Sequence, residues 1–184
     1  MLWIILAIVV LLILFIISVY NNLVTLRQRV KNAFGQMDVQ LQRRFDLIPN
    51  LVETVKGYMT HESDTLTKIA ELRTAWAGAK TVDEKAKLDN ELSSSLKTIM
   101  AVAESYPDLK ANQNFSSLQN ELTETEDKIS YSRQFYNDTV TRYNTKLELF
   151  PSNIVAGMFH FTAESLFEVD NAEARKNVKV DFNK

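Results

Sequence analysis

The chain begins with an uninterrupted apolar stretch. From Met1 to Leu26 there is no charged side chain, and residues 2–19 are apolar but for one serine. An α-helix of this length reaches roughly 27–30 Å, about the thickness of the hydrocarbon core of a bilayer. Trp3 and Tyr20 lie near its ends, where aromatic rings favour the headgroup region. A cleaved signal peptide is the alternative, but the stretch has neither a basic start nor a small-residue cleavage site. We expect a transmembrane anchor that binds the lipid bilayer through residues 2–19.

Beyond the anchor, apolar residues recur at steps of three and four, which is the pattern of amphipathic helices. The first stripe covers residues 21–77. The second helix opens at a capping box, Thr81–Glu84, and the third ends at Pro151. The linkers are short, so neighbouring helices should pack antiparallel. The pattern predicts an all-α fold, in which the transmembrane helix continues into an elongated antiparallel bundle of three long helices with a short C-terminal helix. The predicted domains are the anchor (1–20), the helical bundle (21–151) and a C-terminal segment with a short helix and a tail (152–184).

Pro49 lies inside the first predicted helix. Proline removes one helical hydrogen bond and clashes with the carbonyl group four residues earlier, so we expect either a kink near Pro49 or a full turn there. Asp46 would cap the amide groups freed beyond the proline, and Arg43 would lie within its reach. A kink leaves the apolar segment 154–167 at the far end of the rod, whereas a turn returns it toward the bilayer.

Charged residues also fall on or beside the first apolar stripe. Arg44, Glu62 and Arg73 occupy such positions, where an unpaired charge costs free energy. We therefore expect partners on a facing helix, with glutamates of the third helix as candidates: Glu121, Glu124 and Glu126. The resulting polar cluster either ties the helices together or forms a ligand or partner site. Its predicted members are Arg43, Arg44, Asp46, Pro49, Glu62 and Arg73.

Two further segments have side-chain patterns that indicate a binding surface. Tyr136-Asn137 and Tyr143-Asn144 recur after seven residues, which keeps both pairs on one helical face. They are interpreted as half-buried positions with hydroxyl groups in water, or as the lining of a peptide groove. The segment 154–167 has a broad apolar face that would enter the membrane interface, dock on the bundle or meet another subunit.

The first helix carries more apolar surface than one seam needs. The shorter second helix leaves its membrane-proximal half without obvious cover, and exposed apolar patches of this kind usually mark an interface. Tethering to a membrane also raises the effective concentration of neighbouring chains. We therefore expect a homo-oligomer, with an interface that includes Val39, Phe45, Leu51 and Tyr58.

Composition removes several kinds of chemistry. The 184 residues include no cysteine and two histidines, and the formal net charge is −2. This excludes thiolate catalysis, and the near-neutral charge argues against nucleic-acid binding. His61 and His160 are far apart, and position 65, where a zinc-protease helix would need a second histidine, is threonine. No nucleophile elbow or phosphate loop is present. We expect no enzymatic activity, no metal and no cofactor.

Several motifs resemble the LemA family. They include Asp46-Leu47-Ile48-Pro49-Asn50-Leu51-Val52, Tyr106-Pro107-Asp108-Leu109-Lys110-Ala111-Asn112, Tyr136-Asn137, Tyr143-Asn144 and Val180-Asp181-Phe182. The resemblance implies a single-pass bacterial membrane protein with a helical-bundle body and no established enzymatic activity.

These observations lead to a prediction of function. We expect a membrane-anchored scaffold or adaptor that acts by protein binding and self-assembly, with a membrane protein as a possible partner. A membrane-organising oligomer and an accessory regulator of a membrane protease are the alternatives. Because Arg27, Arg29 and Lys31 follow the span, the body is expected on the cytoplasmic side of the bacterial inner membrane, with the amino terminus outside.

Overall fold

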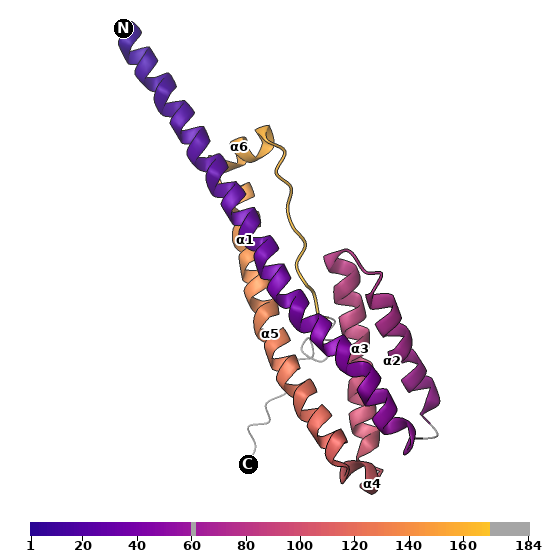
Figure 1. Cartoon of the computed structure of the whole chain (residues 1–184). Helices are drawn as coiled ribbons and strands as arrows, with labels where there is room; N and C mark the ends of the chain where they lie inside the picture. Colours follow the sequence, from indigo (N-terminus) through magenta and orange to yellow (C-terminus); the bar gives the residue numbers. More distant parts are fainter. Residues whose placement is uncertain (60–61, 170–184) are drawn as a thin grey trace, which may run out of the picture.

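The computed structural model describes residues 1–59 and 62–169. This described part consists of helices and connecting segments, without a strand. Figure 1 shows α1 as a long rod: its later half packs with α2, α3 and α5, and its N-terminal end projects away from them. The all-α helical bundle predicted from the sequence is confirmed. The helices are α1 (Leu2–Lys56), α2 (Ser63–Trp76), α3 (Val82–Ala103), α4 (Pro107–Lys110), α5 (Gln113–Glu148) and α6 (Ser152–Met158).

The projecting part of α1 is the apolar stretch. Its most apolar 18-residue window has a mean hydropathy of 3.4, and none of that window is buried within the fold. Leu23 is the first fully buried residue of the helix. An exposed apolar helix of this length and composition indicates a membrane anchor, because water solvates such a surface poorly.

The core is formed where the predicted stripes meet. α1 and α5 lie side by side along most of the bundle, and α2 pairs with α3. The rings of Phe34 on α1 and Tyr136 on α5 are 5.6 Å apart, and Arg44 on α1 contacts Glu126 on α5. Since one partner's number rises as the other's falls, α1 and α5 run antiparallel. The largest fully buried apolar side chains are Tyr136, Tyr143, Phe45, Phe167, Leu23, Met37, Leu41, Ile48, Leu51, Met59 and Ile69.

The predicted first helix over residues 21–77 is wrong in one respect: the chain reverses between Lys56 and Ser63. The amide groups of Tyr58 and Met59 both donate to the Val55 carbonyl at 2.9 Å as α1 ends, and α2 begins after Glu62. The periodicity did not reveal this turn because the apolar positions on both sides of it face the same core. Val55, Met59, Leu66 and Ile69 are all buried.

Pro49 is not the site of the turn. α1 runs through it as one continuous helix, and Pro49 itself is exposed. Phe45, Ile48 and Leu51, on both sides of it in the sequence, are buried, and their packing offsets the hydrogen bond that proline removes. Asp46 caps no freed amide group, since no new helix starts there. It is exposed and accepts a hydrogen bond from Gln42 at 2.8 Å.

Side-chain caps start two of the helices, and the first of them is the predicted capping box. The Thr81 hydroxyl accepts from the Glu84 amide at 3.2 Å, and the Glu84 carboxylate accepts from the Thr81 amide at 3.0 Å, which completes the capping box of α3. Asn112 caps α5 by accepting from the amide groups of Asn114 and Phe115. These caps fix where α3 and α5 begin, and α5 carries the residues described next.

The reversal before α2 also decides where the chain returns. With that additional turn, α5 runs back toward the anchor, and α6 lies beside α1 where the exposed part of α1 begins (Figure 1). The ring of Phe159, just after α6, is 4.7 Å from the ring of Tyr20. From there, residues 159–169 run without regular secondary structure along the bundle.

Candidate functional site: a ladder that holds an extended segment

The two Tyr-Asn pairs of α5 form one line of polar groups. Seven residues separate Tyr136-Asn137 from Tyr143-Asn144, so the second pair lies two turns above the first on the same face. All four side chains reach the chain segment that follows α6. We call these four residues the ladder and residues 162–168 the strap.

The two asparagines each hold one residue of the strap by both of its main-chain polar groups. The Asn144 amide donates to the carbonyl of Glu164 at 2.9 Å and accepts from its N–H at 3.0 Å. Asn137 does the same with Phe167, at 3.1 Å and 2.8 Å. This pairing needs a side chain with both a donor and an acceptor, which an amide provides and a carboxylate does not.

The two tyrosines each donate one further hydrogen bond to a carbonyl group of the strap. Tyr143 donates to Thr162 at 3.0 Å, and Tyr136 donates to Ser165 at 2.8 Å. Both rings are buried. Burial raises the pKa of Tyr136 to about 12, and it also raises the pKa of Tyr143. Both phenols therefore stay protonated at neutral pH and remain donors.

The spacing of the ladder matches the rise of an extended chain. Seven residues of helix advance roughly 10.5 Å, and three residues of extended chain advance about 10 Å. Asn144 and Asn137 accordingly bind Glu164 and Phe167, which are three residues apart. The tyrosines follow the same rule with Thr162 and Ser165. Side chains seven residues apart on α5 thus bind strap residues that are three positions apart.

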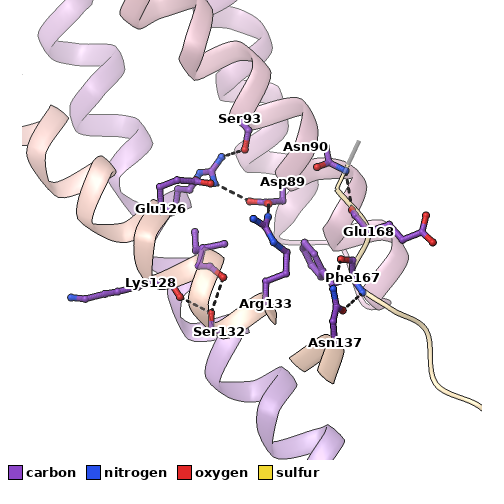
Figure 2. Close-up of polar contacts among 12 residues, drawn as sticks. Asp89, Asn90, Ser93, Glu126, Lys128, Ser132, Arg133, Asn137, Phe167 and Glu168 are labelled. Atoms are coloured by element: carbon purple, nitrogen blue, oxygen red, sulfur yellow. Dashed lines mark hydrogen bonds and ion pairs between the residues drawn. The ribbon is translucent and has the colours of Figure 1, made fainter. Parts of the chain in front are cut away.

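The fold also binds one side chain of the strap, that of Phe167. Phe167 is buried in the core cluster, and Figure 2 shows it beside Asn137. On the other side of the strap, Asn90 of α3 donates to the carbonyl of Glu168 at 3.2 Å. An open hollow of about 720 Å³ lies between α3 and the strap, lined in part by Asp83, Lys87 and Asn90. We call the ladder, Asn90 and the buried site of the Phe167 ring (the Phe167 pocket) the groove, and the chain's own strap occupies it. Tyr136 and Tyr143 are buried and their hydroxyl groups bond to the strap, so the interpretation as half-buried positions with hydroxyl groups in water is wrong. Binding of a peptide from another chain stays a prediction.

A buried ionic cluster ties α1, α3 and α5 together next to this groove. Arg44 and Asp89 are each 1% exposed, and their charged groups are 3.2 Å apart. Arg44 also contacts Glu126 at 2.5 Å and donates to the Ser93 hydroxyl. Figure 2 shows Asp89, Ser93 and Glu126 converging from α3 and α5, with Arg133 on the other side of Asp89. Burial raises the pKa of Asp89, and this outweighs the opposing effect of Arg44.

The structure does not bring the predicted polar cluster together. Arg44 finds the predicted partner, Glu126. Arg43 and Arg73 are exposed instead, because neither faces the core. Glu62 lies at the start of α2, where its carboxylate accepts from the Tyr106 hydroxyl at 3.1 Å. The other two candidate glutamates stay outside the cluster: Glu124 pairs with Lys128 along its own helix, and Glu121 is exposed.

Four residues of these sites were not predicted from the sequence: Asp89, Ser93, Arg133 and Asn90. A signal for Asp89 was available, because it lies three residues after Ala86 and three before Leu92, both buried on the same stripe. A carboxylate in that position predicts a buried partner in the same way as Arg44 did. Asn90 and Ser93 give no comparable signal, since polar residues beside a stripe usually face water.

Two residues of the predicted oligomer interface lie inside the fold. Phe45 and Leu51 are buried, and the Phe45 ring stacks on Trp76 of α2 with centroids 4.2 Å apart. α2 folds back along α1, and its Trp76 covers Phe45. The assumption of one long helix could not foresee this. Tyr58 is half-buried and accepts from Asn112 at 3.1 Å, whereas Val39 is exposed.

Comparisons with known proteins show the family of the chain. The model of the LemA family matches residues 33–182. The chain is 27% identical over 157 residues to Protein LemA of Metamycoplasma hominis, which covers 83% of this chain and 70% of that protein. It is 23% identical over 175 residues to Magnetosome protein MamQ 2 of Paramagnetospirillum magneticum, covering 81% of this chain and 64% of that protein. Magnetosome protein MamQ of Magnetospirillum gryphiswaldense is similar to the same extent, at 23% over 174 residues with 80% and 64% coverage.

Fold and site define a class of protein: a helical bundle on an apolar anchor helix, with a groove that holds an extended segment by its main chain. The chain belongs to the LemA family. It spans less than two thirds of the length of the MamQ relatives.

Proposed function

We propose that the protein is a membrane-anchored scaffold or adaptor that binds protein segments in its groove and assembles with further copies at the membrane. The observation that carries this proposal is the set of bonds between the ladder and the strap. All six join a side chain of α5 to a main-chain atom. Groups placed in this way recognise an extended chain rather than one particular sequence.

Selectivity comes from the Phe167 pocket. An extended segment from another chain satisfies the ladder as well as the strap does, provided that a large apolar side chain follows three residues after the one held by Asn144. The strap of a second copy meets this requirement. Chains tethered to one membrane are also at high effective concentration, which favours exchange between neighbours.

A second surface supports self-assembly. Val39 on α1 and Tyr131 on α5 are 63% and 76% exposed, and they line one open hollow together with Gln36 and Lys128. Large exposed apolar side chains next to each other favour contact with another protein. We propose that Val39 belongs to an interface between copies. Val39→Glu should then lower the mass of the full-length protein in mild detergent to that of one chain, and an unchanged mass would refute the interface.

The groove is tested with a peptide of residues 159–169. Full-length protein in mild detergent is titrated into the fluorescently labelled peptide, and anisotropy is recorded. In Phe167→Ala the chain's own strap loses the side chain that fills the Phe167 pocket, so the strap is held less tightly. The peptide should therefore bind this variant more tightly than the wild type. Adding Asn137→Ala to Phe167→Ala removes two bonds to the peptide and should weaken binding again.

The controls separate binding from unfolding. Circular dichroism must show native helix content in each variant. A peptide that carries alanine at position 167 should bind weakly to every variant, because it lacks the group that fills the pocket. If the unaltered peptide binds Phe167→Ala no better than it binds the wild type, the groove is only a structural clasp, and the proposed adaptor role loses its support.

The side of the membrane is also a proposal. Arg27, Arg29 and Lys31 follow the anchor, and basic residues resist translocation, so we place the bundle in the cytoplasm of a bacterium. The chain has no cysteine, which makes a single Ser94→Cys variant a clean reporter at an exposed position. An impermeant thiol reagent should label it only after intact cells are lysed, and labelling of sealed cells would reverse the assignment.

A further inference from the structure

The surface around α6 is apolar and exposed. Val155 and Ala156 face the bundle and are buried, whereas Ile154 and Met158 lie one turn apart on the outer face and are 55% and 59% exposed. α6 is therefore apolar on both sides, which is unusual for a helix on the outside of a bundle. Large apolar side chains flank it in the chain and are exposed as well: Leu149, Phe150 and Phe159.

This surface lies at the end of the anchor. Tyr20 follows directly after the apolar span, and its ring is 4.7 Å from Phe159 and 5.7 Å from Phe161. Figure 1 shows α6 lying crosswise to α1 at this level. If residues 2–19 cross the hydrocarbon core, Tyr20 lies in the headgroup region, and the side chains around α6 are held within a few ångströms of it.

We propose that α6 and its flanking residues form a foot that inserts into the lipid interface beside the anchor. The foot comprises Leu149, Phe150, Ile154, Met158 and Phe159. A short helix with an exposed apolar face is stable at the boundary between headgroups and acyl chains, where its side chains leave water. Nearby cations suit phosphate headgroups: the guanidinium of Arg27 lies over the Phe161 ring at 5.0 Å, and Lys146 is in the last turn of α5.

Lipid fits this surface better than a second copy does, because the foot is continuous with a helix that is itself apolar on every side. Going from the N-terminus, the residues of α1 are exposed until Ile16 and Val19, which are partly covered and still lie within the apolar span. Other parts of the fold therefore cover α1 already within the apolar span, at the level expected to lie in the membrane. This proposal does not depend on what the groove binds. Its physical consequence is a second point of attachment, which fixes the tilt and rotation of the bundle on the bilayer.

Single-cysteine variants test the foot in the full-length protein. Met158→Cys and Ile154→Cys report on the exposed apolar face, Asn153→Cys reports on the exposed polar position next to Ile154, and Ser117→Cys reports on the opposite end of the bundle. Each variant carries an environment-sensitive fluorophore and is reconstituted into lipid nanodiscs that hold one chain. Lipids with a nitroxide near the headgroup then quench fluorophores in the interface, and aqueous iodide quenches fluorophores in water.

We expect labels at 154 and 158 to be quenched several-fold more strongly by the shallow nitroxide lipid than the label at 117. Iodide should show the reverse order, and position 153 should be intermediate. Labels at 154 and 158 that respond to iodide as strongly as the label at 117 would overturn the proposal. Labels that become shielded only when nanodiscs hold several chains would also overturn it, because a second copy would then be the cover. Native circular dichroism of each labelled chain ensures that the labels report on the folded protein.

Discussion

The buried pair Arg44–Asp89 gives a sharp test of how the bundle is held together. We predict that Arg44→Met destabilises the protein by about 3–5 kcal/mol, the usual cost of leaving one buried charge without its partner. The two groups are 3.2 Å apart, and at an effective dielectric constant near 20 their attraction is about 5 kcal/mol. Glu126 offsets little of the loss, because its side chain is 48% exposed and is solvated without Arg44.

Arg43 provides a matched control. It precedes Arg44 in the same helix but is exposed, so Arg43→Met should change the free energy of unfolding by no more than about 0.5 kcal/mol. Denaturant unfolding of the full-length protein in one detergent, followed by circular dichroism, measures both variants. In a chain of this length, 1 kcal/mol corresponds to about 2–4 °C of melting temperature. Arg44→Met should therefore melt roughly 10 °C below the control.

A double variant separates the ion pair from simple packing. Arg44→Met with Asp89→Leu removes both charges, and apolar replacements of a buried pair are often neutral or stabilising. The double variant should therefore recover most of the stability lost in Arg44→Met. The loss in Arg44→Met alone should also shrink in acid, because a protonated Asp89 needs no cation. If the double variant is as unstable as the single one, or if Arg44→Met behaves like Arg43→Met, this account of the cluster is wrong.

Two further predictions concern Tyr136 and Pro49. The pKa of Tyr136 rises from 10.0 unfolded to about 12 in the fold. Its contribution to stability, about 2.7 kcal/mol for two pKa units, is therefore fully present below pH 10 and lost as the pH rises through 12. Tyr136→Phe should flatten the fall in unfolding free energy between pH 10 and 12, and an equally steep fall would contradict the assignment. Pro49→Ala should stabilise the protein by about 1–3 kcal/mol, since alanine restores a helical hydrogen bond within a continuous α1. Small-angle scattering should show an unchanged shape because the chain reverses elsewhere, and a longer particle would refute this.

Parts of this fold follow from sequence because they depend on local chemistry. The long apolar helix that suggests an anchor, the capping box at Thr81 and the stripe of α5 each result from residues close together in the chain, and the structure contains all three. Arg44 is similar: a charge within an apolar stripe requires a partner, and one of the three candidates, Glu126, supplies it.

The reversal between α1 and α2 could not be placed in this way. The proline at position 49 is the strongest local signal for a break in this region, but the chain reverses after Lys56. The outcome depends on tertiary packing, because Phe45 and Leu51 on either side of Pro49 are buried against other helices and keep α1 intact. The strap was hidden for the same reason. Residues 162–168 have no regular pattern of their own, and their conformation is set by α5.

The foot and the groove, both proposals, have a combined consequence for assembly. The strap begins shortly after α6 and runs antiparallel to α5, away from the proposed lipid interface. Its distance from the bilayer is therefore fixed by the position of α6. Every copy whose foot rests in the same lipid interface then presents its strap and its ladder at one height. A neighbour's strap therefore meets the ladder in register, and exchange between chains needs lateral movement only. Charged substitutions in the foot such as Ile154→Asp should therefore weaken capture of a neighbour's strap in membranes while leaving binding of the free peptide of residues 159–169 unchanged.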